Sequence, residues 1–175
     1  MKPIYLLSLA TLLIFNSCSN EEQVNEKVEE KSVEEENEWT NLQINDGGYK
    51  LSIEVPNEKL GQGIGEAVYL EDIGELEVRV GQEFDLFILE DQSQLEMIKN
   101  ELSDHPFYKV EFTVANDSSL LYRQYTENGG EEQWHVYAER NIGSTILLIR
   151  SNEAIPFTEY RAKLMLQSAL SITPL

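Results

Sequence analysis

The chain has few cysteines, histidines and basic residues for its length. Its 175 residues include one cysteine, two histidines and 13 lysines and arginines, against 32 aspartates and glutamates, which gives a formal net charge of −19. One cysteine cannot form a disulfide within the chain, so packing alone must stabilise the core. The shortage of positive charge argues against nucleic acid and anionic lipid as partners, because both bind to a positive field.

Long apolar runs are also missing. The main apolar run, residues 4–15 (IYLLSLATLLIF), is only twelve residues long. As a helix it would rise ~18 Å at ~1.5 Å per residue, which is too short for a hydrocarbon core of ~30 Å. A run of this length after the positively charged start at residues 1–2 is typical of a secretory signal. The sequence therefore predicts a signal peptide over residues 1–17.

The only cysteine, Cys18, follows this run in the sequence FNSC. FNSC resembles the lipobox of bacterial lipoproteins, in which the cysteine sulfur receives a diacylglycerol and the cysteine becomes the N-terminus after cleavage. The chain departs from the usual box at Phe15 and Asn16, in the manner of the relaxed boxes of the Bacteroidetes. The resemblance implies that Cys18 is a lipid-attachment residue; a plain secretory signal is the alternative.

Lipidation would hold the chain on a membrane, because two or more acyl chains give stable anchoring at ~0.8 kcal/mol per buried methylene. Ser19 stands after the cysteine in place of the aspartate that retains enterobacterial lipoproteins at the inner membrane. Residues 19–23 (SNEEQ) resemble the acidic export signal of surface-displayed Bacteroidetes lipoproteins. These resemblances imply a lipid-anchored protein of the bacterial outer membrane, with the periplasmic and the surface leaflet both open.

A strongly acidic segment separates the cysteine from the rest of the chain. Residues 21–38 contain nine glutamates and two lysines, a net charge of −7. Such a composition buries too little apolar surface to offset the entropy of ordering, so we predict a disordered tether over residues 18–38 with a reach of ~25 Å. A helix is the alternative, because Val24 and Val28 would share one face.

Residues 39–175 have the length of one globular domain. Apolar and polar residues alternate in four segments, and a continuous apolar run in a fifth predicts a central strand covered on both faces. Turn residues divide residues 108–151 into four antiparallel strands. The predicted strands cover residues 49–55, 75–80, 109–114, 133–140 and 144–151.

Two segments with helical periodicity accompany these strands. In residues 93–102, Ser93 and Glu96 have the spacing of a capping box. Residues 158–172 begin with Thr158 as a predicted N-cap. The fold class is therefore predicted to be α+β, a mainly antiparallel sheet with amphipathic helices packed on it.

The order of these elements resembles the PsbP-type fold. The features are an opening strand that ends in EVP, a helix in the middle, a strand meander, and a last helix that reads RAKLMLQSALSI, over about residues 49–172. The fold is named after an extrinsic subunit of photosystem II and recurs in small bacterial lipoproteins. The resemblance implies a binding or scaffolding module and transfers no site residues.

Histidines are the usual activating bases of catalytic nucleophiles. His105 is expected in a turn, and His135 is expected on the solvent face, because it alternates with Trp134, which is predicted to face the core. The sequence has no G-x-S-x-G motif around a serine. We therefore predict two surface histidines and no enzyme.

Metal and phosphate motifs are absent from the sequence as well. Residues 61–66 (GQGIGE) lack the residues of a P-loop, so a flexible connector is the prediction. Three acidic doublets near predicted strand ends, Glu71–Asp72, Glu90–Asp91 and Glu131–Glu132, carry the hard oxygen ligands that calcium prefers, but acidic residues at such positions normally face water. No cofactor or metal is predicted.

Aromatic residues on the predicted meander are the remaining candidates for binding. They are Tyr122, Tyr125, Trp134 and Tyr137, of which Tyr137 is predicted to be the surface contact. The sequence predicts a non-enzymatic, membrane-anchored binding or assembly module of the cell envelope, with an envelope protein as partner. A lipoprotein that binds a small molecule or an ion in a cleft between sheet and helices is the alternative.

Overall fold

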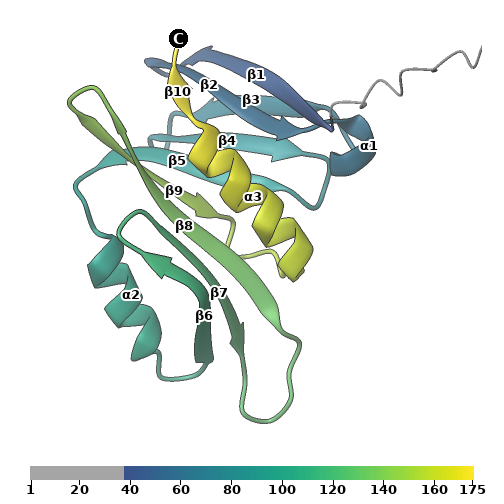
Figure 1. Cartoon of the computed structure of the whole chain (residues 1–175), viewed down its shortest axis with the longest axis vertical. Helices are drawn as coiled ribbons and strands as arrows, with labels where there is room; N and C mark the ends of the chain where they lie inside the picture. The colour runs from purple at the N-terminus through teal and green to yellow at the C-terminus, as the bar shows by residue number, and fades with distance from the viewer. Residues whose placement is uncertain (1–37) are drawn as a thin grey trace, which may run out of the picture. The chain divides into compact units, whose positions relative to one another are not determined.

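Two antiparallel sheets and three helices make up residues 38–175, the part of the chain that the computed structural model describes (Figure 1). The predictions for the signal peptide, for Cys18 and for the tether up to residue 37 lie outside the described residues. The α+β class with a mainly antiparallel sheet is confirmed.

The smaller sheet has three strands in the order β1-β2-β10. They are β1 (Trp39–Asp46), β2 (Tyr49–Pro56) and β10 (Thr173–Pro174). The short helix α1 (Glu58–Gly61) follows β2. The predicted strand at residues 49–55 is confirmed as β2, whose Leu51, Ile53 and Val55 are buried.

The larger sheet has seven strands in the order β3-β4-β5-β9-β8-β7-β6. Each strand pairs antiparallel with its neighbours. Because β6, β7, β8 and β9 are consecutive, the predicted meander is confirmed. The strands are β3 (Gly65–Leu70), β4 (Glu75–Val80), β5 (Asp85–Asp91), β6 (Lys109–Asn116), β7 (Ser119–Tyr125), β8 (Gln133–Ile142) and β9 (Thr145–Ser151).

Strand β9 has the central position that its apolar run predicts. It is the fourth of the seven strands, and its Leu147, Leu148 and Ile149 are all buried. Successive residues of a strand point to opposite faces, so both faces of β9 are covered. This part of the prediction is confirmed.

The helix α3 (Glu159–Ser171) covers one face of the larger sheet. It contacts β5, β7, β8 and β9 of that sheet and β2 of the smaller one, so the main hydrophobic core lies around it. Figure 1 shows α3 running across the larger sheet. The predicted cap is confirmed, because Thr158 Oγ1 accepts a hydrogen bond from the Arg161 N–H at 3.4 Å.

The helix α2 (Leu95–Ser103) covers the other face, at the end of the sheet where β6, β7 and β8 lie (Figure 1). On β7, Leu121 joins the main core, whereas its neighbours Leu120 and Tyr122 form a second core with Leu95 of α2. The alternation along β7 therefore divides the interior into two cores, one on each face of the sheet.

The predicted capping box of α2 is wrong. Gln94 is the N-cap residue and its side chain makes no cap bond. Glu139 of β8 supplies the cap instead, because its Oε1 accepts from the N–H groups of Gln94 and Leu95 at 2.6 and 2.9 Å. Ser93 Oγ donates to Glu139 Oε2 at 2.8 Å. The helix is thus capped from the sheet on which it packs, a contact that no local spacing reveals.

Candidate functional site

The structure places His135 in the interior, so the prediction of a surface histidine at this position is wrong. The side chain is 0% exposed. Its Nδ1 lies 3.2 Å from Ser151 Oγ, which also accepts the Val136 N–H at 3.1 Å. Its Nε2 has no hydrogen-bond partner within residues 38–175. Burial lowers the pKa of His135, because the charged ring would lose its hydration.

Two tyrosines beside His135 share one carboxylate. Tyr137 Oη donates to Glu153 Oε1 at 2.8 Å, and Tyr122 Oη lies 3.3 Å from the same oxygen. The two tyrosine rings stack with their centroids 6.3 Å apart. Burial, followed by the charge of Glu153, raises the pKa of both hydroxyls, so both act as donors.

This buried group cannot perform hydrolysis, although it brings a histidine, a serine and a carboxylate to one region. Ser151 and His135 are both 0% exposed, so a substrate has no access to the serine hydroxyl. Tyr137 is half-buried against the second core, and its predicted role as a surface contact stays a prediction. Trp134 packs against the main core, which confirms its predicted place.

A surface hollow lies where the loop between α2 and β6 meets the loop after β7. Its volume is about 450 Å³, within the ~300–1,000 Å³ range of ligand sites, and it is open to solvent. We call it the loop hollow. It is lined by His105, Pro106, Phe107, Tyr108, Lys109, Thr126, Glu127 and Asn128.

Two aromatic rings of the loop hollow face solvent. Phe107 is 78% exposed and Tyr108 is 37% exposed. His105 orders this loop, because its Nδ1 accepts from the N–H groups of Phe107 and Tyr108 at 3.2 Å each. The His105 ring also lies 5.0 Å from the Tyr108 ring, centroid to centroid. A ligand would therefore meet rings that are already positioned, which lowers the entropy cost of binding.

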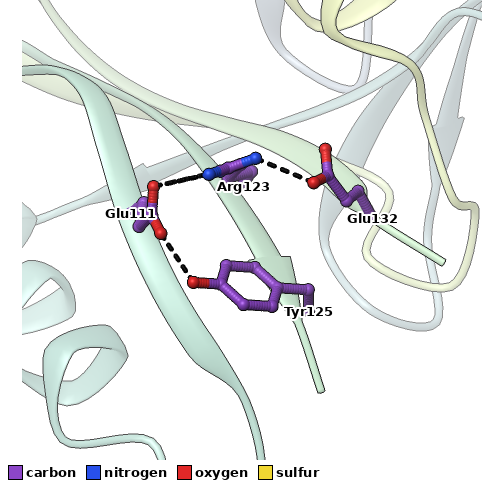
Figure 2. Close-up of polar contacts among 4 residues, drawn as sticks. All are labelled: Glu111, Arg123, Tyr125 and Glu132. Atoms are coloured by element: carbon purple, nitrogen blue, oxygen red, sulfur yellow. Dashed lines mark hydrogen bonds and ion pairs between the residues drawn. The ribbon is translucent and has the colours of Figure 1, made fainter. Parts of the chain in front are cut away.

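A cluster of four polar side chains comes from β6, from β7 and from the loop before β8 (Figure 2). Its Tyr125 pairs across the sheet with Lys109 of the loop hollow. Tyr125 Oη donates to Glu111 Oε1 at 2.6 Å, and Arg123 Nη2 donates to Glu111 Oε2 at 2.8 Å. Arg123 Nη1 also donates to Glu132 Oε1 at 2.8 Å. The Tyr125 hydrogen bond, followed by that of Arg123, lowers the pKa of Glu111. We call these four residues the β6–β7 cluster.

Carboxylates outnumber cations on this surface, and the cations are paired. Lys109 Nζ lies 3.0 Å from Glu127 Oε1, and this contact raises the pKa of Lys109. Neither the loop hollow nor the β6–β7 cluster contains a serine or a cysteine. The loop hollow and the β6–β7 cluster together contain three acids and two bases, namely Glu111, Glu127 and Glu132 with Lys109 and Arg123.

The acidic doublets do not assemble a metal site in the described part of the chain. Glu71–Asp72 lies in the turn before β4, Glu90–Asp91 ends β5, and Glu131–Glu132 lies in the loop before β8. No group of three or more histidine, cysteine, aspartate or glutamate side chains within residues 38–175 could hold a metal ion.

A smaller apolar groove lies between the smaller sheet and the loop before β3. It measures about 180 Å³ and is lined in part by Leu42, Val55 and Ile64. The glycine-rich segment beside it serves close packing, because a Cβ at Gly63 would come 2.6 Å from the Gly81 nitrogen. The groove lies below the ~300 Å³ of ordinary ligand pockets.

No protein-family model matches the chain, and a search of curated proteins returns no significant match. Among residues 38–175, no helix is long and apolar enough to cross a membrane.

Proposed function

We propose that the chain is a membrane-anchored lipoprotein of the bacterial cell envelope whose domain is a non-enzymatic binding or assembly module. The observation that carries this proposal is the sequence FNSC at the end of a short apolar run, with Cys18 as the only cysteine. Ser19 and the sequence SNEEQ at residues 19–23 support the outer membrane as the site of the anchor, and the acidic segment after it would separate the domain from the lipid surface. A PsbP-like arrangement of the domain belongs to the same proposal.

Two structural features support a binding role. The polar group around His135 is closed to solvent, whereas the loop hollow presents ordered aromatic rings outside the core. Ordered aromatic side chains contribute large contact areas at low entropy cost and are enriched at binding interfaces. The surface of the domain is therefore suited to holding a partner.

Metabolic labelling with an alkyne fatty acid tests the anchor. The wild-type chain should incorporate the label and sediment with membranes, and Cys18→Ala should do neither. Ser19→Ala is the matched control, because it leaves the cysteine in place. A Cys18→Ala chain that still carries the label would contradict the proposed attachment site.

The second candidate function is binding of a small molecule or an ion. The apolar groove at Leu42, Val55 and Ile64 would suit a compact apolar molecule, because its volume of about 180 Å³ lies below that of ordinary ligand pockets. A ligand there would shift the backbone amide signals of these residues in an NMR screen of small apolar compounds. Unchanged signals at saturating compound would remove this candidate.

A further inference from the structure

Exposed aromatic rings line the loop hollow, and carboxylates outnumber cations on the loop hollow and the β6–β7 cluster taken together. We infer that the loop hollow binds a lysine- or arginine-containing segment of an envelope protein. This inference rests on the proposed binding function and adds to it the surface and the chemistry of the partner.

The aromatic rings provide the first contact. Phe107 is the most exposed large hydrophobic residue within residues 38–175, and Tyr108 follows it directly. The face of an aromatic ring attracts an ammonium or a guanidinium group, and the aliphatic part of a lysine or arginine side chain packs against it. The same chemistry already occurs within this chain, where the Arg123 guanidinium lies 5.3 Å from the centroid of the Tyr125 ring.

The carboxylates provide the second contact. Glu127 is 74% exposed at its side chain, and its partner Lys109 is 58% exposed. Exposed ion pairs of this kind contribute little to stability, so an incoming cation can replace Lys109 at Glu127. Glu111, Glu127 and Glu132 against Lys109 and Arg123 leave the loop hollow and the β6–β7 cluster negative after both cations are counted.

Charge also argues against the other occupants. Residues 39–175 carry 23 acidic and 10 basic side chains, so a second copy of the domain would meet like charge, as would an anionic membrane. A neutral sugar would use the rings and donate hydroxyl hydrogen bonds to the carboxylates, but it would gain no net charge attraction. A cationic peptide gains the ring contacts, the hydrogen bonds and the charge attraction.

The test uses the whole 15N-labelled chain in detergent and the peptide acetyl-(Arg-Ser)4-amide at low salt. The matched control peptide has citrulline in place of each arginine, which keeps the shape and removes the charge. The arginine peptide should shift the amide signals of Tyr108 and Gly129 and leave those of Ile73 and Gly74 in place, since these two lie in the turn before β4. The citrulline peptide should shift neither pair.

Two variants with opposite expected effects sharpen the test. Glu127→Gln should weaken binding about fivefold, because it removes a carboxylate and leaves Lys109 without its partner. Lys109→Gln should tighten binding, because it frees Glu127 for the ligand. If the ion pair only held the loop in shape, the two substitutions would change the affinity in the same direction. Phe107→Ala should weaken binding about fivefold, and Ile64→Ala is its matched control, because Ile64 is 74% exposed at a different site.

Equal shifts with both peptides, or shifts confined to the acidic segment before residue 38, would overturn the inference. A neutral oligosaccharide that shifts Tyr108 where the arginine peptide does not would overturn it in favour of sugar binding. The proposed function would survive either result, because lipid labelling of Cys18 and partner capture at another surface do not depend on the loop hollow.

Discussion

The two histidines of the domain lie in opposite surroundings. His135 lies in a strand, is fully buried and has one ring nitrogen without a partner within the described chain. His105 lies in a loop, where its Nδ1 accepts hydrogen bonds from the backbone N–H groups of the exposed Phe107 and Tyr108. In the first region the polar groups are enclosed and contribute to stability, and in the second they organise a surface. Residue type alone therefore does not identify a functional site. The element that carries the residue determines whether its side chain is buried or lies at the surface.

The largest expected effect on stability comes from truncating a buried tyrosine, compared with truncating a surface tyrosine on the same strand. Tyr122→Ala should lower the free energy of unfolding by ~3–5 kcal/mol, because it removes a fully buried ring from the second core. Tyr125→Ala on the same strand should leave the urea midpoint nearly unchanged, since this ring belongs to the surface cluster. Equal losses in urea unfolding would contradict the division between core and surface.

The cap of α2 provides the next effect. Glu139→Ala should cost ~1–2 kcal/mol, because two N–H groups at the start of the helix lose their acceptor. Glu96→Ala is the control, since Glu96 is the residue that the local spacing assigns to the cap. The two urea midpoints decide between the cap from β8 and the local capping box, and a larger loss in Glu96→Ala would favour the box.

His135 makes stability depend on pH. Its pKa in the folded state is lowered by burial, so the unfolded chain binds the proton first. The stability from the neutral ring is fully present above the unfolded pKa of ~6.5 and decreases as the pH falls below it, by at most ~1.4 kcal/mol per pH unit.

Urea titrations between pH 7.5 and pH 5 measure this slope, and His135→Phe should flatten it even if the variant is less stable at every pH. The difference in slope between the wild-type chain and His135→Phe is due to the histidine, because both chains keep Asp85 and Glu77, whose pKa values burial raises. An unchanged slope in His135→Phe would contradict the account.

The smallest effect on stability is expected in the β6–β7 cluster. Arg123→Gln should leave the urea midpoint nearly unchanged, because the cluster is exposed. It should raise the pKa of Glu111, which loses hydrogen bonds from the guanidinium. NMR titration of the Glu111 carboxylate measures this change, and an unchanged pKa would show that Tyr125 alone sets it.

Sequence patterns predicted most of the fold. Alternation located β2, β4, β6 and β8, because one face of each strand packs on a core. Strand β5 was missed, since its first four residues are all buried and show no alternation. Strand β1 was missed because Ile44 is its only buried residue, which leaves little apolar pattern.

The candidate site was harder to predict. His135 shares its strand face with Tyr137, and alternation assigned that face to solvent. Tyr137 packs with α2 in the second core. His135 lies against the rings of Tyr122 and Phe157, which come from other parts of the sequence. Phe107 and Tyr108 lie outside any periodic segment, so no pattern selected them. The available signal was the sequence DHPF, where a histidine and a proline in a turn precede an aromatic residue.

Photocrosslinking in living cells tests the central claim of an anchored binding module most directly. A photoreactive amino acid would replace Phe107 in the lipidated chain and in the Cys18→Ala chain, with Ile73 as the control position, since it is 56% exposed in a different turn. The account predicts a specific envelope protein, joined through a basic segment, at position 107 of the lipidated chain only. Identical products at positions 107 and 73, or products that are unaffected by Cys18→Ala, would contradict it.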